Sequence, residues 1–134
     1  MSTAGSLYDA IILGSGPAGL SAALALSRVR RRSLIVSVPG TYRNVLAPEI
    51  HTVITREGMP PLTFLETARE ELRMYGFARF LDGKVISVKK AVRRFNVSLE
   101  DGTEVHGRKL VIAMGSRDIL PDIPGNSMSI EILR

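Results

Sequence analysis

The sequence predicts an α/β fold in which a βαβ unit with a parallel central sheet is followed by an added antiparallel β-meander. Two observations lead to this fold class. Residues 8–38 contain an apolar run, an alanine- and leucine-rich segment and a second apolar run, which is the order of a βαβ unit. After residue 78 the chain alternates short apolar and polar stretches around an Asp101-Gly102 turn, which indicates consecutive antiparallel strands.

The βαβ unit is expected to consist of a strand, a helix and a second strand. Residues 8–13 form a short run with β-branched side chains that ends at glycine, as a buried strand does. Residues 17–29 predict a helix, and Pro17 suits its first turn. Residues 33–38 repeat the apolar run and end at Pro39, so they predict the second strand.

A long loop, a second helix and several short strands are expected after this unit. Residues 41–59 have no periodicity and predict a loop, which a ligand or partner would have to order. A helix is expected from Pro61 to Tyr75, with Gly76 at its C-terminal end. The expected meander strands are residues 84–90, 95–99 and 103–107, and residues 110–113 are expected to return to the parallel sheet.

Length and composition predict one globular domain. With 134 residues, 45% hydrophobic and 23% charged, the chain is able to bury a core. The absence of cysteine excludes disulfides and a Cys-x-x-Cys redox pair within these residues. No secretory signal is visible, and glycines and a proline interrupt the most apolar stretch, residues 10–27. We therefore expect no membrane span and a cytoplasmic location.

The net charge of +5 comes from basic residues in short clusters. The clusters are Arg28, Arg30, Arg31 and Arg32; Lys89, Lys90, Arg93 and Arg94; and Arg108 with Lys109. Because no aromatic residues are interleaved with them, base stacking is poorly supported and nucleic acid is not an expected partner. Solvated ends of strands and helices explain such clusters, and an acidic protein partner is the alternative.

A complete G-x-G-x-x-G sequence joins the first predicted strand to the first predicted helix. It comprises Gly14, Ser15, Gly16, Pro17, Ala18 and Gly19. In this context the first glycine allows a tight turn, the second lets the backbone approach a pyrophosphate, and the third lets helix and strand pack closely. The helix amides and dipole then face the phosphates. The sequence therefore predicts a Rossmann-like FAD/NAD(P)-binding βαβ unit, and a purely structural glycine turn is the alternative.

The acidic residue that usually accompanies this sequence is missing. An Asp or Glu at the end of the second strand normally accepts hydrogen bonds from a ribose of the dinucleotide. Here the strand ends at Val38, and no acid follows before Glu49. Losing a charge-assisted hydrogen bond costs roughly 1.5–3 kcal/mol, which weakens binding about tenfold to a hundredfold. We expect an intact pyrophosphate site and a weakened ribose site, unless a shifted register brings Ser37 into position.

Several segments resemble thioredoxin-reductase-like FAD-dependent oxidoreductases of the class II pyridine nucleotide-disulfide oxidoreductase family. These are YDAIILGSGPAG at residues 8–19, GTYRN at 40–44 with HTV at 51–53, and VIAMGSRD at 111–118 followed by PDIPG at 121–125. The middle group is most similar to the fungal branch, which includes the dithiol oxidases of gliotoxin-type biosynthesis. The resemblance implies FAD as the cofactor.

The resemblance adds residues to the predicted cofactor site. It places Gly40, Thr41 and Arg43 in a loop over the adenosine and ribityl parts of the flavin. It also places His51 beside the flavin and Ala113 near the cofactor at the end of a later strand. Without the resemblance, His51 is a lone loop histidine, and the two alternatives for Arg43 are pairing with a phosphate and a solvated loop arginine. His106 is expected to have a structural role at a strand end.

The resemblance also divides the chain and reveals departures from the family. It implies an N-terminal tail at residues 1–7, the first half of an FAD-binding domain at 8–125 and a divergent tail at 126–134. Relatives carry an acid in place of Val38 and usually a threonine in place of Met114. They continue into a pyridine-nucleotide domain with the Cys-x-x-Cys pair and then complete the FAD domain. By this resemblance the chain is truncated.

Two classes of function follow. The first is an FAD-binding thioredoxin-reductase-like oxidoreductase, or its FAD half, in fungal-type secondary metabolism. The second is a non-redox protein on the same scaffold, either a cofactor-free biosynthetic cyclase or isomerase or a regulatory partner of a full-length relative. An inactive truncated relic is a further possibility outside both classes. No sequence pattern identifies a catalytic residue or a metal site. The sheet edges of a half domain favour a homo-oligomer or an acidic protein partner that completes the fold.

Overall fold

The structure, a computed structural model, describes residues 6–44 and 46–116. Its elements are β1 (Leu7–Leu13), α1 (Pro17–Arg28), β2 (Ser33–Ser37), α2 (Pro61–Tyr75), β3 (Ala78–Asp82), β4 (Val85–Ala91), β5 (Arg94–Leu99) and β6 (Glu104–Ile112). The predicted βαβ unit, second helix and meander are confirmed. The expected tail at 126–134 and the PDIPG segment at 121–125 lie outside the described residues.

The strands form one sheet with the order β3-β2-β1-β6-β5-β4. β1 pairs in parallel with both β2 and β6, and β2 pairs in parallel with β3. β5 pairs antiparallel with β4 and with the first part of β6. The sheet is therefore a parallel sheet that continues into an antiparallel meander, as the fold class predicted.

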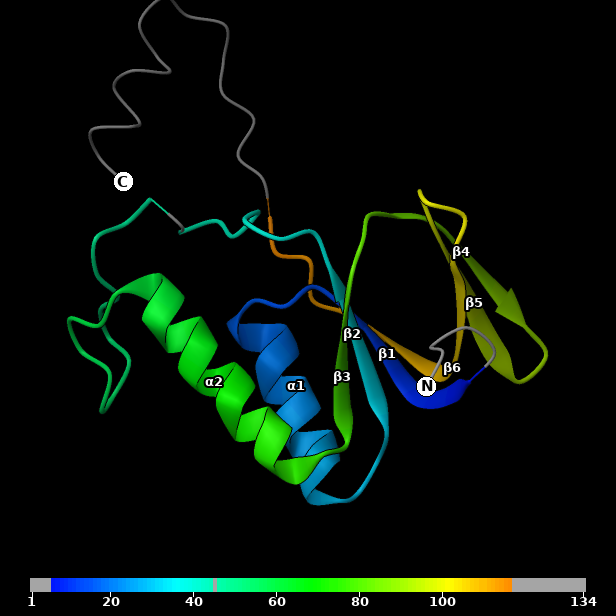
Figure 1. Cartoon of the computed structure of the whole chain (residues 1–134), viewed down its shortest axis with the longest axis horizontal. Helices are drawn as coiled ribbons and strands as arrows, with labels where there is room; N and C mark the ends of the chain where they lie inside the picture. The colour runs from blue at the N-terminus through cyan, green and yellow to red at the C-terminus, as the bar shows by residue number, and fades with distance from the viewer. Residues whose placement is uncertain (1–5, 45, 117–134) are drawn as a thin grey trace, which may run out of the picture.

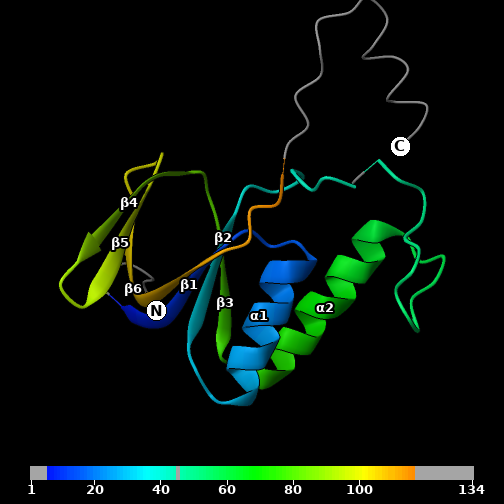
Figure 2. The same ribbon diagram turned by 180° about the vertical axis from the view of Figure 1, so that it is seen from behind.

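The two helices lie on one side of the parallel strands β1, β2 and β3, and the meander lies on their other side (Figures 1 and 2). Ile12 and Ile35 point to the helix face, where they pack with Leu20, Leu65 and other helix residues. The next residues along the same strands point to the opposite face and pack against the meander. This second cluster contains Ile11, Leu13, Leu34, Val36, Val97, Leu99 and Val105. Both faces of β1 and β2 are therefore buried, which explains their uninterrupted apolar runs.

β6 differs from the prediction of two separate strands at 103–107 and 110–113. It is one continuous strand, whose first part pairs with β5 and whose later part runs along β1. Gly107 lies where the partners overlap, and a Cβ there would approach Ile11 Cγ1 to 2.7 Å. The missing side chain lets the strand pass close to β1 without a break. His106 consequently lies inside a strand and not at its end, and its Nδ1 is 3.0 Å from Asn96 Oδ1 of β5.

β3 is a parallel edge strand that the sequence analysis did not predict separately. Its residues Arg79 and Asp82 are exposed, so it lacks the apolar run that marks β1 and β2. The chain instead positions it through α2, which ends at Gly76 with a left-handed φ of 71°. No helix within residues 6–44 and 46–116 is long and apolar enough to cross a membrane.

Candidate functional site

The candidate site lies where three parallel strands end at the same edge of the sheet (Figure 1). The amide of Gly14, after β1, donates to the carbonyl of Val36 in β2 at 2.8 Å. The amide of Ala113, after β6, donates to the carbonyl of Leu13 at 2.8 Å. Each loop is thus anchored to a neighbouring strand. In open parallel sheets, ligands bind beyond the carboxyl ends of the strands. This edge of the sheet is therefore the candidate binding position.

Gly14 and Gly19 are required by close packing of the backbone. Gly14 has a φ of 107°, and a Cβ there would overlap the carbonyl oxygen of Ala113. A Cβ on Gly19 would overlap the carbonyl oxygen of Gly14. These two glycines therefore let β1, α1 and the end of β6 approach one another, which fixes the position of the turn between them.

Gly16 differs from both, because a Cβ at this position would meet no atom within 4 Å. It is the N-cap residue of α1, and no side chain caps the helix there. The first turn of the helix contains no acidic residue. This uncapped N-terminus, which carries the positive end of the helix dipole, therefore has no side-chain acceptor among the described residues. A pyrophosphate fits this position, since it needs close backbone approach and free amide donors.

The loop after β2 is connected to the loop after β6. Gly40 makes the turn with a φ of 75°, and the Thr41 hydroxyl donates to the Val38 carbonyl at 2.7 Å. Arg43 Nη1 donates to the hydroxyl of Ser116 at 2.8 Å. The structure thus brings the predicted residues Gly40, Thr41 and Arg43 to the same sheet edge as Ala113 and the glycine turn.

Val38 lies just beyond β2 with 37% of its surface exposed. The register of β2 is fixed on both sides, since Val36 pairs with Leu13 and Ser37 pairs with Asp82. Ser37 is therefore held in the last pair of the strand, and no shift moves it to the position of Val38. Val38 therefore stands at the end of β2, where the G-x-G-x-x-G fold usually carries an acidic residue.

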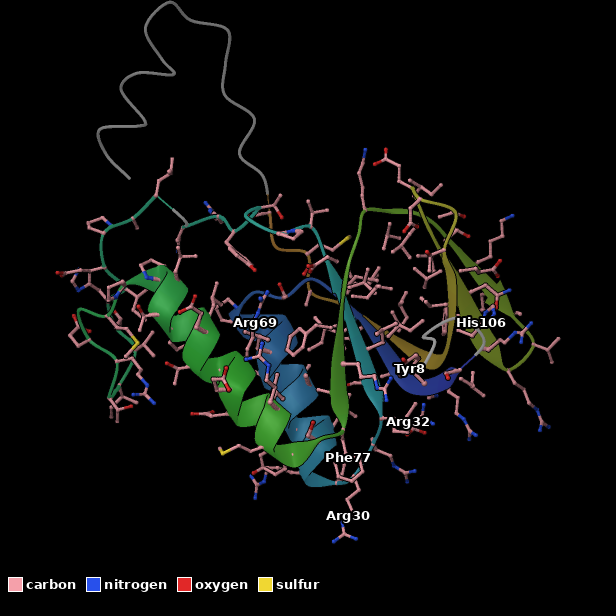
Figure 3. The ribbon with its side chains drawn as sticks, in the orientation of Figure 1. Tyr8, Arg30, Arg32, Arg69, Phe77 and His106 are labelled. Atoms are coloured by element: carbon pink, nitrogen blue, oxygen red, sulfur yellow. The ribbon has the colours of Figure 1, made fainter. Side chains whose placement is uncertain are left out.

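Sequence reasoning missed a polar cluster of Ser15, Tyr42 and Arg69 beside the glycine turn. Arg69 Nη2 lies 2.7 Å from the Tyr42 hydroxyl and 3.3 Å from the Ser15 hydroxyl, and these two hydroxyls are 3.3 Å apart. Figure 3 shows Arg69 between α2 and the sheet. A signal was available in the sequence, because position 69 follows the buried Leu65 by one helical turn and precedes the buried Leu72.

His51 lies in the segment between Asn44 and α2, away from the cluster just described. Its Nδ1 is 2.7 Å from Glu57 Oε1, and its Nε2 is 3.9 Å from Glu49 Oε2. Glu57 also accepts the amide hydrogen of Thr52, at 2.8 Å. The polar contacts of His51 are thus with its own segment, and the structure does not bring it together with the glycine turn.

The hydrogen bond from His51 and the charge of Glu57 raise the pKa of His51, and the same bond lowers the pKa of Glu57. The attraction between protonated His51 and ionised Glu57 is fully present below the ordinary histidine pKa. It is lost as the pH rises through the raised pKa of His51. At the acidic end it is lost as the pH falls through the lowered pKa of Glu57.

Glu57→Gln is expected to return the pKa of His51 toward its ordinary value, because glutamine keeps the shape of the acceptor but carries no charge. NMR titration of the His51 ring measures the change. Glu49→Gln is the control and should produce a smaller decrease, since Glu49 is farther from the ring. An unchanged His51 pKa in Glu57→Gln would contradict the pairing.

Comparisons with known proteins identify the family. Residues 8–134 match the pyridine nucleotide-disulphide oxidoreductase family, and the chain belongs to it. Over 93% of its length it is 40% identical to the thioredoxin reductase sirT of Leptosphaeria maculans and 41% identical to the thioredoxin reductase tcpT of Claviceps purpurea. A solved oxidoreductase structure from Agrobacterium tumefaciens covers 92% of the chain with 33% identity and a TM-score of 0.85.

These comparisons confirm the resemblance to fungal thioredoxin-reductase-like proteins and the Rossmann-like, FAD-binding type of fold. The chain spans only part of the proteins that it matches. It covers 39% of the length of each of the two fungal relatives and 41% of the solved chain from Agrobacterium tumefaciens. The activity of the complete relatives therefore enters only as a proposal for this chain.

Proposed function

We propose that this chain binds FAD through the adenosine diphosphate part of the cofactor and serves as the FAD half of a thioredoxin-reductase-like oxidoreductase. The observation that carries the proposal is the open position at Gly16, between two glycines that close packing requires. The N-terminus of α1, which no side chain caps, would supply amide donors for the pyrophosphate. The loop containing Gly40, Thr41 and Arg43 supports the proposal because its Tyr42 hydroxyl lies 3.3 Å from the Ser15 hydroxyl of the same turn.

Bound FAD would supply an electron-accepting ring, and the residues of this chain would bind and orient it. These residues include no cysteine, so they cannot themselves form a redox dithiol. Ala113 and Arg43 remain proposed cofactor-binding residues at the sheet edge, and His51 is proposed on the family resemblance alone. A role in fungal-type secondary metabolism is likewise part of the proposal.

Gly16→Val tests the function directly. The backbone at Gly16 has a φ of −75° and a ψ of −178°, which valine adopts without strain, and an added Cβ meets no atom within 4 Å. The free energy of unfolding should therefore fall by only about 1 kcal/mol, because valine is a poorer N-cap than glycine. The side chain would occupy the proposed pyrophosphate position, so FAD affinity should fall about a hundredfold.

Isothermal titration calorimetry with FAD, together with thermal unfolding, checks both expectations. Gly76→Val is the control for binding, because Gly76 ends α2 and lies in open space away from the glycine turn. It should lose stability through its left-handed φ but keep FAD affinity. Equal FAD affinity in Gly16→Val and the unmodified chain would refute the proposed site.

A non-redox role on the same scaffold is the second candidate, and Val38 is the observation that favours it. With no acid at this position, the adenosine ribose lacks its usual charged acceptor, which weakens FAD binding. A protein that binds no FAD under saturating conditions would support this candidate.

We also propose that a further strand completes the sheet beside β6. Within the described residues, β5 pairs with β6 only from Glu104 to Gly107, so the side of β6 beyond Gly107 that faces away from β1 has no partner there. Ile112 at its end is 68% exposed. A second copy of this chain or an acidic partner would satisfy the backbone groups of this edge, with Arg108 and Lys109 nearby to attract acidic side chains.

A further inference from the structure

Arg69 is partly buried, and no carboxylate among the described residues neutralises its charge. Its guanidinium lies 5.3 Å from the centre of the Phe80 ring, and its Nε is buried with no hydrogen-bond partner in the described part of the chain. Nη2 donates to the hydroxyl groups of Tyr42 and Ser15, which are both uncharged. The contacts hold the guanidinium in place, but none of them supplies a negative charge.

Two other arginines, Arg56 and Arg73, do have carboxylate partners. Arg73 pairs with Glu70 on the same helix, and Arg56 lies 4.0 Å from Glu71. Within residues 6–44 and 46–116, Arg69 has no carboxylate within ion-pair distance. Keeping a cation partly buried without an anion is costly, so an anion that is not part of these residues would stabilise it.

The position of Arg69 indicates which anion this is. Ser15, which receives one of its hydrogen bonds, is the residue between the two glycines that shape the turn. Tyr42, which receives the other, belongs to the loop after β2 that carries Thr41 and Arg43. The guanidinium therefore contacts the residue that precedes Gly16 and is held from two of the loops that form the site.

We propose that Arg69 is a specificity-determining residue that makes the site select ligands containing a pyrophosphate. This inference rests on the proposed function. Its charge adds to that of the α1 N-terminus and favours the phosphates over uncharged parts of the ligand. Its hydrogen bonds also keep the loop after β2 close to the glycine turn. ADP, which contains the pyrophosphate and the adenosine, is the matching probe, and adenosine is the uncharged comparison.

Arg69→Gln removes the charge but keeps a polar side chain, and Arg69→Lys keeps the charge. ADP affinity should fall about tenfold in Arg69→Gln and stay within about threefold of the unmodified chain in Arg69→Lys. Adenosine affinity should be the same in all three proteins. Arg73→Gln, which alters an exposed arginine one turn along α2, should leave both affinities unchanged. Isothermal titration calorimetry measures each dissociation constant, and thermal unfolding verifies folding.

Three results would overturn the inference. ADP affinity that is unchanged in Arg69→Gln would show that the charge does not reach the ligand. Equal losses for ADP and adenosine would show that Arg69 only maintains the shape of the site. If the unmodified chain binds neither FAD nor ADP, the proposed function fails and the inference fails with it. Binding by the unmodified chain with no change in Arg69→Gln overturns the inference alone.

Discussion

Gly14→Ala is expected to lower the free energy of unfolding by about 3 kcal/mol or more, because two costs combine at this position. The φ of 107° disfavours any L side chain, and the new Cβ would overlap the carbonyl oxygen of Ala113. Ala113 cannot move freely, since its amide is bonded to Leu13 at 2.8 Å. Urea unfolding followed by circular dichroism measures the loss.

Gly76→Ala separates the two costs. Gly76 also has a left-handed φ, 71°, but an added Cβ there meets nothing within 4 Å. Only the backbone cost of about 1 kcal/mol should appear. The difference between the two variants then reports the close packing of β1 against the end of β6. Similar losses in both would show that the turn accommodates a side chain and is not tightly packed.

The part of the fold that follows from local pattern was predictable. β1, α1 and β2 were recognisable because both faces of the strands are buried and the helix follows a glycine turn. β3 was not, because exposed Arg79 and Asp82 interrupt its apolar character and its position depends on α2. The continuity of β6 was also hidden, since it depends on the approach of Gly107 to Ile11, a contact between distant parts of the chain.

The candidate site, like the fold, was predictable from the sequence only in part. The glycine turn was predictable because its geometry is encoded in adjacent residues. Gly40, Thr41, Arg43 and Ala113 needed the family resemblance, and the structure places them at the same sheet edge. The cluster of Ser15, Tyr42 and Arg69 joins residues from three elements, and helical spacing alone marks only Arg69 as unusual. An arginine on the apolar face of a predicted helix, as at position 69, is a feature that can mark a functional residue.

Val38→Asp is expected to strengthen FAD binding about tenfold to a hundredfold, because it restores an acceptor for a ribose of the cofactor. Val38 is 37% exposed beyond the end of β2, so an aspartate there stays hydrated in the free protein and costs little stability. Fluorescence titration with FAD measures the gain. ADP, which contains the same ribose, should gain by a similar factor.

Two comparisons show whether the gain comes from the ribose. FMN lacks the adenosine part of FAD, so its affinity should be the same in Val38→Asp and the unmodified chain. Val88→Asp introduces the same charge at a valine that is 38% exposed on β4, and it should leave FAD affinity unchanged. If FMN gains as much as FAD, the aspartate acts elsewhere in the site. If neither ligand gains, Val38 is not the ribose position, and the weakness of the site lies in another residue.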